Sequence, residues 1–158
     1  MTSTLATILG EHEFLKGLKP EYLQLIAGCA SNVKFDAGET LFREGDEAHK
    51  FFAVRQGRVA LDIFAPGRGP ISIQTVGEGE VIGWSWLVPP YQMRFDVHAL
   101  TSARALVFDG RCLRGKFASD PELGYELMHR FSQVILRRLE AMSIQLLDLY
   151  GDHYGEHE

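Results

Sequence analysis

The stretch that decides the fold of this chain reads Gly77-Glu-Gly-Glu-Val-Ile-Gly-Trp-Ser-Trp-Leu-Val-Pro-Pro-Tyr-Gln-Met-Arg-Phe95. Glycines crowd its front, where the backbone must turn tightly or approach another group closely. Trp84 to Val88 are long enough for one helical turn, and Pro89-Pro90 stop it. A glycine bend, a helix start with free N–H groups and Arg94 just beyond predict a small anion site. The alternative is a tight corner between two strands with an ordinary surface arginine.

Composition places the chain among globular proteins with a single domain. It has 158 residues, of which 46% are hydrophobic and 23% charged, and a net charge of −5. No apolar run approaches the roughly 20 residues of a membrane span, and the first ten residues lack a signal-peptide layout. The acidic balance argues against a nucleic-acid binder. Cys29 and Cys112 lie far apart and suggest neither a zinc pair nor a disulfide, so we expect a reduced, cytoplasmic protein.

The period of the apolar residues changes twice along the chain. The first 30 residues have a helical pattern, with Leu15 and Leu18 on one stripe, His12 at the edge of the helix surface, and Pro20 opening a second helix. From Ser31 to Phe108 apolar and polar residues alternate between regularly spaced glycine turns. This pattern predicts an antiparallel β barrel or sandwich.

After Phe108 the pattern is helical again. Residues 111–118 form a short helix, and Asp120 and Pro121 are a strong start for a long one that runs to Tyr150. Gly151 is a natural stop. We therefore expect a domain over residues 1–150, with the long helix at about 120–150, and a flexible tail over residues 151–158.

The long helix carries an apolar stripe with heptad-like spacing and one stutter. A small barrel does not easily cover a helix of about 45 Å, so we interpret the stripe as the seam of a homodimer. The alternative is a helix packed wholly on its own barrel. The seam residues are Phe131, Ile135, Leu139, Met142, Leu146 and Leu149.

Four motifs in the same order resemble those of the cyclic-nucleotide-binding domain family, and within it the Crp/Fnr-type regulators. They are Ala37-Gly-Glu-Thr-Leu-Phe-Arg-Glu-Gly-Asp46, Phe52-Ala-Val-Arg-Gln-Gly-Arg-Val59, Gly79-Glu-Val-Ile-Gly83 and Asp120-Pro-Glu-Leu123. The resemblance covers about residues 12–150. It implies an α+β, mainly β fold: a jelly-roll barrel with N-terminal helices and a long C-terminal dimerisation helix.

The resemblance also marks a ligand site and a departure from it. In the family a glutamate that holds the ribose follows the glycine of the phosphate-binding cassette, and here Trp84 stands in its place. Arg94 matches the phosphate-binding arginine, but Phe95 replaces the usual serine or threonine and Asp96 would repel a phosphate. Trp84 cannot accept a hydrogen bond, which should cost about 1.5–3 kcal/mol of binding. The candidate ligand-binding residues are Gly83, Trp84, Ser85, Arg94 and Phe95.

Two functions remain open at this stage. The first is a non-catalytic sensor or regulatory module that binds cyclic AMP, cyclic GMP or another small anion, or that has lost its ligand. The second is a docking subunit for a protein partner, with Trp84, Trp86 and Phe95 filling the pocket. The chain ends about eight residues beyond the long helix, without the helix-turn-helix of Crp/Fnr regulators, so we expect no DNA binding.

No metal or enzyme site stands out in the sequence. The clustered histidines of metal-binding cupin barrels are absent, and His49 and His98 are isolated. No Ser/His/Asp or paired-carboxylate arrangement is recognisable. Single histidines and cysteines leave a haem-based sensor open.

Overall fold

The structure is a computed structural model that describes the backbone of residues 4–155 and the side chains of residues 4–149. Two four-stranded antiparallel sheets form a jelly-roll barrel, with strand orders β1-β8-β3-β6 and β2-β7-β4-β5. This is the predicted α+β architecture. The strands are β1 (Ala30–Phe35), β2 (Thr40–Phe42), β3 (Lys50–Gln56), β4 (Val59–Ala65), β5 (Gly69–Val76), β6 (Val81–Ile82), β7 (Asp96–Ala99) and β8 (Ala103–Asp109).

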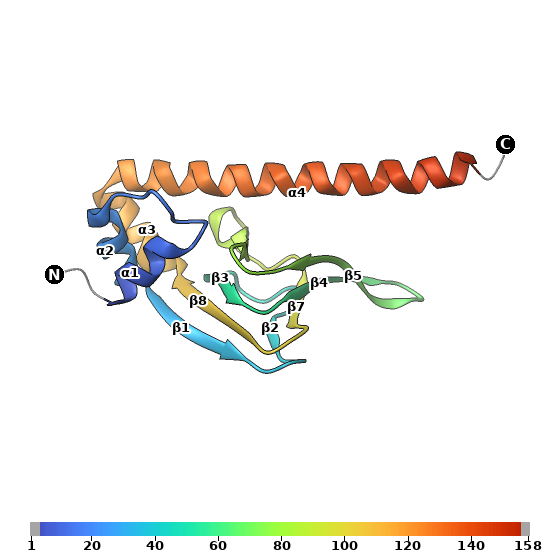
Figure 1. Ribbon diagram of the computed structural model, residues 1–158, viewed down its shortest axis with the longest axis horizontal. Coiled ribbons are helices and arrows are strands. Elements are labelled where there is room, and N and C mark those ends of the chain that lie inside the picture. Colours follow the sequence, from blue (N-terminus) through green and yellow to red (C-terminus); the bar gives the residue numbers. More distant parts are fainter. Residues whose placement is uncertain (1–3, 156–158) are drawn as a thin grey trace.

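Helices cap one end of the barrel and run along its side (Figure 1). α1 (Thr4–Glu11), α2 (Pro20–Ala27) and α3 (Gly110–Ser119) gather at the end where β1 starts and β8 finishes, whereas α4 (Pro121–Gly155) extends along the whole molecule. As predicted, the Asp120 carboxylate caps α4 by accepting from the Leu123 N–H at 3.3 Å.

Two predicted helix boundaries are wrong. α1 ends at Glu11, and Leu15 and Leu18 lie in a series of turns rather than on a helical stripe. Both side chains are nonetheless buried, because the turns fold back on the barrel. α4 continues through Gly151 to Gly155. A glycine inside a helix costs only about 1 kcal/mol, which does not stop a helix of 35 residues. The flexibility predicted for residues 151–158 stays a prediction.

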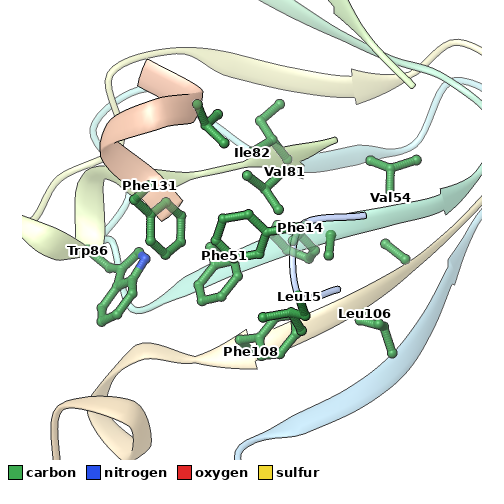
Figure 2. Close-up of a cluster of buried hydrophobic side chains, with 14 of the residues drawn as sticks. Phe14, Leu15, Phe51, Val54, Val81, Ile82, Trp86, Leu106, Phe108 and Phe131 are labelled. Carbon is green, nitrogen blue, oxygen red and sulfur yellow. The ribbon is translucent and has the colours of Figure 1, made fainter. Parts of the chain in front are cut away.

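Stacked aromatic rings form the part of the core nearest the helices (Figure 2). Phe51 of β3 lies 4.4 Å from Phe108 and 5.5 Å from Trp86, both in parallel stacks. Phe131 of α4 meets Phe51 edge-on at 4.9 Å and Phe14 at 4.8 Å. Each such pair adds about 0.5–1.5 kcal/mol to the burial of its rings. The N-terminal half of α4 is therefore part of the core.

Cys29 and Cys112 form a disulfide, contrary to the prediction. The chain brings α2 and α3 together at one end of the barrel, where the two Cα atoms are 5.6 Å apart despite a sequence separation of 83. The backbone N–H of Asp109 also donates to the Cys29 carbonyl at 2.8 Å, which fixes the start of α3 against the end of α2. The spacing of the two cysteines in the sequence did not predict this pair, because tertiary packing brings them together.

His12 is buried rather than at the surface edge, with only 7% of the residue exposed. Its Nε2 lies 2.8 Å from the Val54 carbonyl oxygen, and its Nδ1 accepts from the backbone N–H of Phe14 at 3.1 Å. With Nε2 donating, both nitrogens of a neutral ring have partners. Burial lowers the pKa of His12, so the imidazole is a neutral structural group.

Candidate functional site

The glycine-led stretch forms a tight corner between β6 and β7. Gly83 has a φ of +93°, a backbone angle that favours glycine. The single helical turn predicted after it is present as the short 3₁₀ helix η1 (Trp84–Leu87). A Cβ on Gly83 would lie 3.3 Å from the Lys50 carbonyl oxygen. This glycine therefore serves both a left-handed turn and a close approach to β3.

All five predicted ligand-binding residues line one cavity, together with Phe42, Leu61, Ile82 and Met93. The volume of this cavity is about 10 Å³, enough for one water molecule at most. Binding sites for small molecules usually measure about 300–1,000 Å³. The cavity is therefore far smaller than such sites, and apolar side chains make up most of its lining.

Trp84 is held by a residue that the sequence analysis missed. The guanidinium of Arg138, from α4, lies 4.5 Å from the centre of the Trp84 ring. The Nη2 of Arg138 donates a hydrogen bond to the carbonyl of Val81, which lies two residues before Gly83. α4 is thus joined directly to the cassette at the position where the family has its glutamate. Stacking of a buried cation on an indole contributes about 2 kcal/mol.

Arg138 is a buried cation that feels the charge of Glu80 but forms no salt bridge with a described carboxylate. Only 7% of it is exposed, and no salt bridge to it occurs within residues 4–149. Its Nη1 is buried and has no hydrogen-bond partner among the described residues. Burial lowers the pKa of Arg138 to about 10, so the guanidinium remains charged at neutral pH. The burial of Arg138 could have been predicted from the sequence. It follows Phe131 and Val134 at the three- and four-residue spacing of the buried face of the helix.

Arg94 and Asp96 lie close together in the chain but have different surroundings. Arg94 is exposed and lines the small cavity. Asp96 accepts at its Oδ1 from the backbone N–H of Glu44 at 2.7 Å, and the predicted repulsion of a phosphate by its charge stays a prediction. The bond to Glu44 ties the β2–β3 connection to the start of β7. Arg94 remains available to an anion at the surface.

The predicted seam residues divide into two groups. Phe131 is 1% exposed and packs in the core of its own chain, so its side chain is not free to meet a partner. Ile135, Leu139, Leu146 and Leu149 are 38%, 59%, 56% and 67% exposed, and Met142 is half-buried. Between Leu139 and Leu149 no side chain of α4 is fully buried. The barrel therefore covers only the first half of the helix.

His98 and His49 are not isolated, and neither forms a recognisable catalytic arrangement. Nδ1 of His98 lies 2.8 Å from Asp62, whose other oxygen accepts from the hydroxyl of Ser72 at 2.6 Å. The carboxylate is in the middle of this group, whereas a hydrolytic triad needs the imidazole next to the serine. His49 lies 2.7 Å from Glu47. Within the described part of the chain, no group of three or more histidine, cysteine or acidic side chains could hold a metal ion.

The jelly-roll barrel, the glycine-led cassette and the long C-terminal helix define a cyclic-nucleotide-binding type of regulatory domain. The chain belongs to the cyclic nucleotide-binding domain family, whose sequence model matches residues 32–120, more than half of its length. It is 31% identical over 83 residues to Acetyltransferase Pat of Mycolicibacterium smegmatis (strain ATCC 700084 / mc(2)155). That match covers 52% of this chain, which spans only 25% of the relative.

Solved structures show the same fold. A cyclic nucleotide-binding protein from Geobacter metallireducens GS-15 is 25% identical with a TM-score of 0.75, covering 87% of this chain and 98% of that chain. The N-terminal domain of a transcriptional regulator from Streptomyces coelicolor A3(2) is 25% identical with a TM-score of 0.68, covering 85% and 94%. Among residues 4–155, no helix is both long enough and apolar enough to cross a membrane.

Proposed function

We propose that this chain is a non-catalytic regulatory module whose cassette is closed and which acts without cyclic AMP or cyclic GMP at the family's site. The observation that supports this most is the cavity of about 10 Å³ with Trp84 in the place of the ribose-binding glutamate. Arg138 holds α4 on the cassette through that same tryptophan. In the proposed state, Arg138 and Trp84 connect α4 to the barrel directly, and no ligand is needed between them.

The module works as a homodimer through the exposed half of α4. Apolar positions persist to Leu149, and a free helix face of this length needs a partner to bury it. The acidic net charge supports regulation through a protein partner rather than direct DNA binding by this domain. The predicted cytoplasmic location also remains a proposal. The Cys29–Cys112 disulfide weighs against it, because disulfides are rare in reducing compartments.

The absence of catalysis is part of the same proposal. The Ser72–Asp62–His98 group supports it, since the arrangement lacks an imidazole next to a nucleophile. The regulatory character of the structural relatives agrees with it.

Calorimetric titration of the wild type and of Trp84→Glu with cyclic AMP tests the proposal. The wild type should bind weakly, with a dissociation constant far above micromolar. Trp84→Glu removes the indole from the cavity and supplies a charged acceptor worth about 1.5–3 kcal/mol, so its affinity should be roughly 10- to 100-fold higher. Arg94→Ala in the Trp84→Glu background should abolish the gain. Micromolar binding of cyclic AMP or cyclic GMP by the wild type would contradict a closed cassette.

A further inference from the structure

A groove of about 490 Å³ lies outside the cassette, between α4 and the turn that leads from β5 into β6. One wall belongs to α4, and the other comes from the connection between α1 and α2, from β5, and from the Glu78-Gly79-Glu80 turn. None of its lining residues is shared with the small cassette cavity. The charged and polar residues in its walls include Glu13, Gln74, Glu78, Glu80, Arg130, Arg137 and Arg138.

Unsatisfied polar atoms concentrate in the walls of this groove. Five buried side-chain nitrogen or oxygen atoms lack a hydrogen-bond partner within the described part of the chain, and three of them belong to residues that line it. They are Nη1 of Arg138, Nε of Arg130 and Oε1 of Gln74. Buried polar groups normally have partners, so a cluster of orphaned donors and one orphaned acceptor indicates a missing partner.

The charges of the groove are separated by wall. Three arginines lie on α4, with Arg137 exposed and Arg138 buried, and three glutamates lie on the opposite wall. No salt bridge within residues 4–149 joins one set to the other. Arg130 is held in place, because its Nη1 donates to the carbonyls of Phe14 at 2.8 Å and Lys16 at 3.0 Å. Glu80 acts on Arg138 through its charge without a salt bridge, so both sets of charges keep hydrogen-bonding capacity for a ligand.

We propose that this groove binds a small ligand that carries an anionic group and a primary amine a few atoms apart. The anionic group, a phosphate or carboxylate, accepts from the guanidinium groups of Arg137 and Arg138, whose planar forks suit such oxygens. The ammonium group donates to the carboxylates of Glu78 and Glu80. The volume lies within the usual range for small-molecule sites.

The position of the groove gives the ligand a regulatory consequence. Its two walls belong to α4 and to the barrel, and Arg138 contacts both the groove and Trp84 of the cassette. A ligand that joins the walls stabilises α4 against the barrel in the folded chain. The position of α4, the helix that we propose for dimerisation, would then depend on a ligand in the groove rather than in the cassette.

Thermal-shift measurements on the full chain with three related probes test the inference. O-phosphoethanolamine carries both a phosphate and an amine, ethyl phosphate lacks the amine, and ethanolamine lacks the phosphate. We expect O-phosphoethanolamine to raise the melting temperature at concentrations where the other two have little effect, because a ligand that binds only the folded state stabilises it. No shift with any of the three probes overturns the proposal, and an equal shift with ethyl phosphate overturns the role of the glutamates.

Variants of exposed residues locate the site without endangering the fold. Arg137→Ala should weaken O-phosphoethanolamine binding by about tenfold or more, as for loss of a charged hydrogen bond. Glu78→Gln should reduce binding to the level of ethyl phosphate. Arg94→Ala, at the cassette, is the matched control and should leave binding unchanged. Unaltered binding by Arg137→Ala, or its loss in Arg94→Ala, overturns the assignment to this groove. The cyclic AMP titration tests the cassette and these measurements test the groove, so either proposal can fail without the other.

Discussion

Two side chains, Trp84 and Arg138, distinguish the cassette of this chain from the family motif. Trp84 brings an indole to a position where an acceptor is needed, and Arg138 stacks on it at 4.5 Å. The tryptophan is visible in the sequence as a departure from the family motif. The arginine becomes meaningful only when α4 lies on the barrel, because 54 residues of chain separate the two positions.

Another single residue, His12, makes the stability of the fold depend on pH. Its pKa is lowered mainly by burial, so the folded chain favours the neutral ring more strongly than the unfolded chain does. This contribution to the free energy of unfolding is fully present above the unfolded pKa of 6.5 and is lost as the pH falls through the lower folded value. Protonation of Nδ1 also removes the acceptor for the Phe14 N–H.

We expect the melting temperature to fall between about pH 7.5 and about pH 5, and to fall less steeply in His12→Gln. The glutamine amide can still donate to the Val54 carbonyl but does not titrate. Melting curves across this pH range measure the difference between the two slopes. His129→Gln, at an exposed position of α4, is the control and should keep the slope of the wild type. Identical slopes in the wild type and in His12→Gln would show that His12 does not carry this dependence.

Among the elements, α4 has two halves with different environments. Its first half contributes Leu123, Leu127 and Phe131 to the core, all at most 1% exposed. Its second half presents Leu139, Leu146 and Leu149, each more than half exposed, beside the barrel. The apolar stripe in the sequence runs through both halves with a single stutter, which is why Phe131 was assigned to the seam together with the others.

Leu139→Glu should convert the proposed dimer into monomers. In a twofold seam the substitution places two carboxylates close together and removes two buried leucines, each worth about 1.5–3 kcal/mol. Ile144→Glu is the matched control, because Ile144 has the same 59% exposure and lies five residues further along, roughly 140° around the helix.

Light scattering over a range of protein concentrations distinguishes the outcomes for α4. A dimeric Ile144→Glu beside a monomeric Leu139→Glu supports the seam. A wild type that is already monomeric, or a Leu139→Glu variant that stays dimeric, rules this face out as the dimer contact.

At the level of the whole molecule, the disulfide joins the beginning and the end of the barrel domain. Cys29 precedes β1, and Cys112 lies in α3 after β8, so the bond closes a loop that contains every strand. A crosslink over so long a loop restricts the unfolded chain and typically contributes about 2–4 kcal/mol. The antiparallel pairing of β1 with β8 brings the two cysteines to the same end.

Protein purified without reductant should contain no free thiol after denaturation, and a reductant should lower its melting temperature. Thiol titration and melting curves with and without reductant measure both effects. Cys112→Ser should melt at the lower temperature and be insensitive to the reductant. Two free thiols in the untreated protein, or a melting temperature that reductant does not change, would show that the bond is not formed in solution.

Several features of this protein could be determined from the sequence alone, because they depend on neighbouring residues. The alternation from Ser31 to Phe108 indicated the strands, Asp120 and Pro121 the start of α4, and the residues around Gly83 a tight corner followed by one helical turn. Local chemistry decides all of these: side-chain period, capping and the allowed backbone angles of glycine. The substitution at Trp84 was likewise readable from its place in a short motif.

Only the tertiary structure decided which distant residues meet. It paired Cys29 with Cys112, buried His12 against Val54, and set Arg138 on Trp84. It also reduced the cassette cavity to about 10 Å³ and opened a groove of about 490 Å³ beside it. These features result from packing between segments far apart in the chain, and side-chain period carries no information about which faces come together or how much space remains between them.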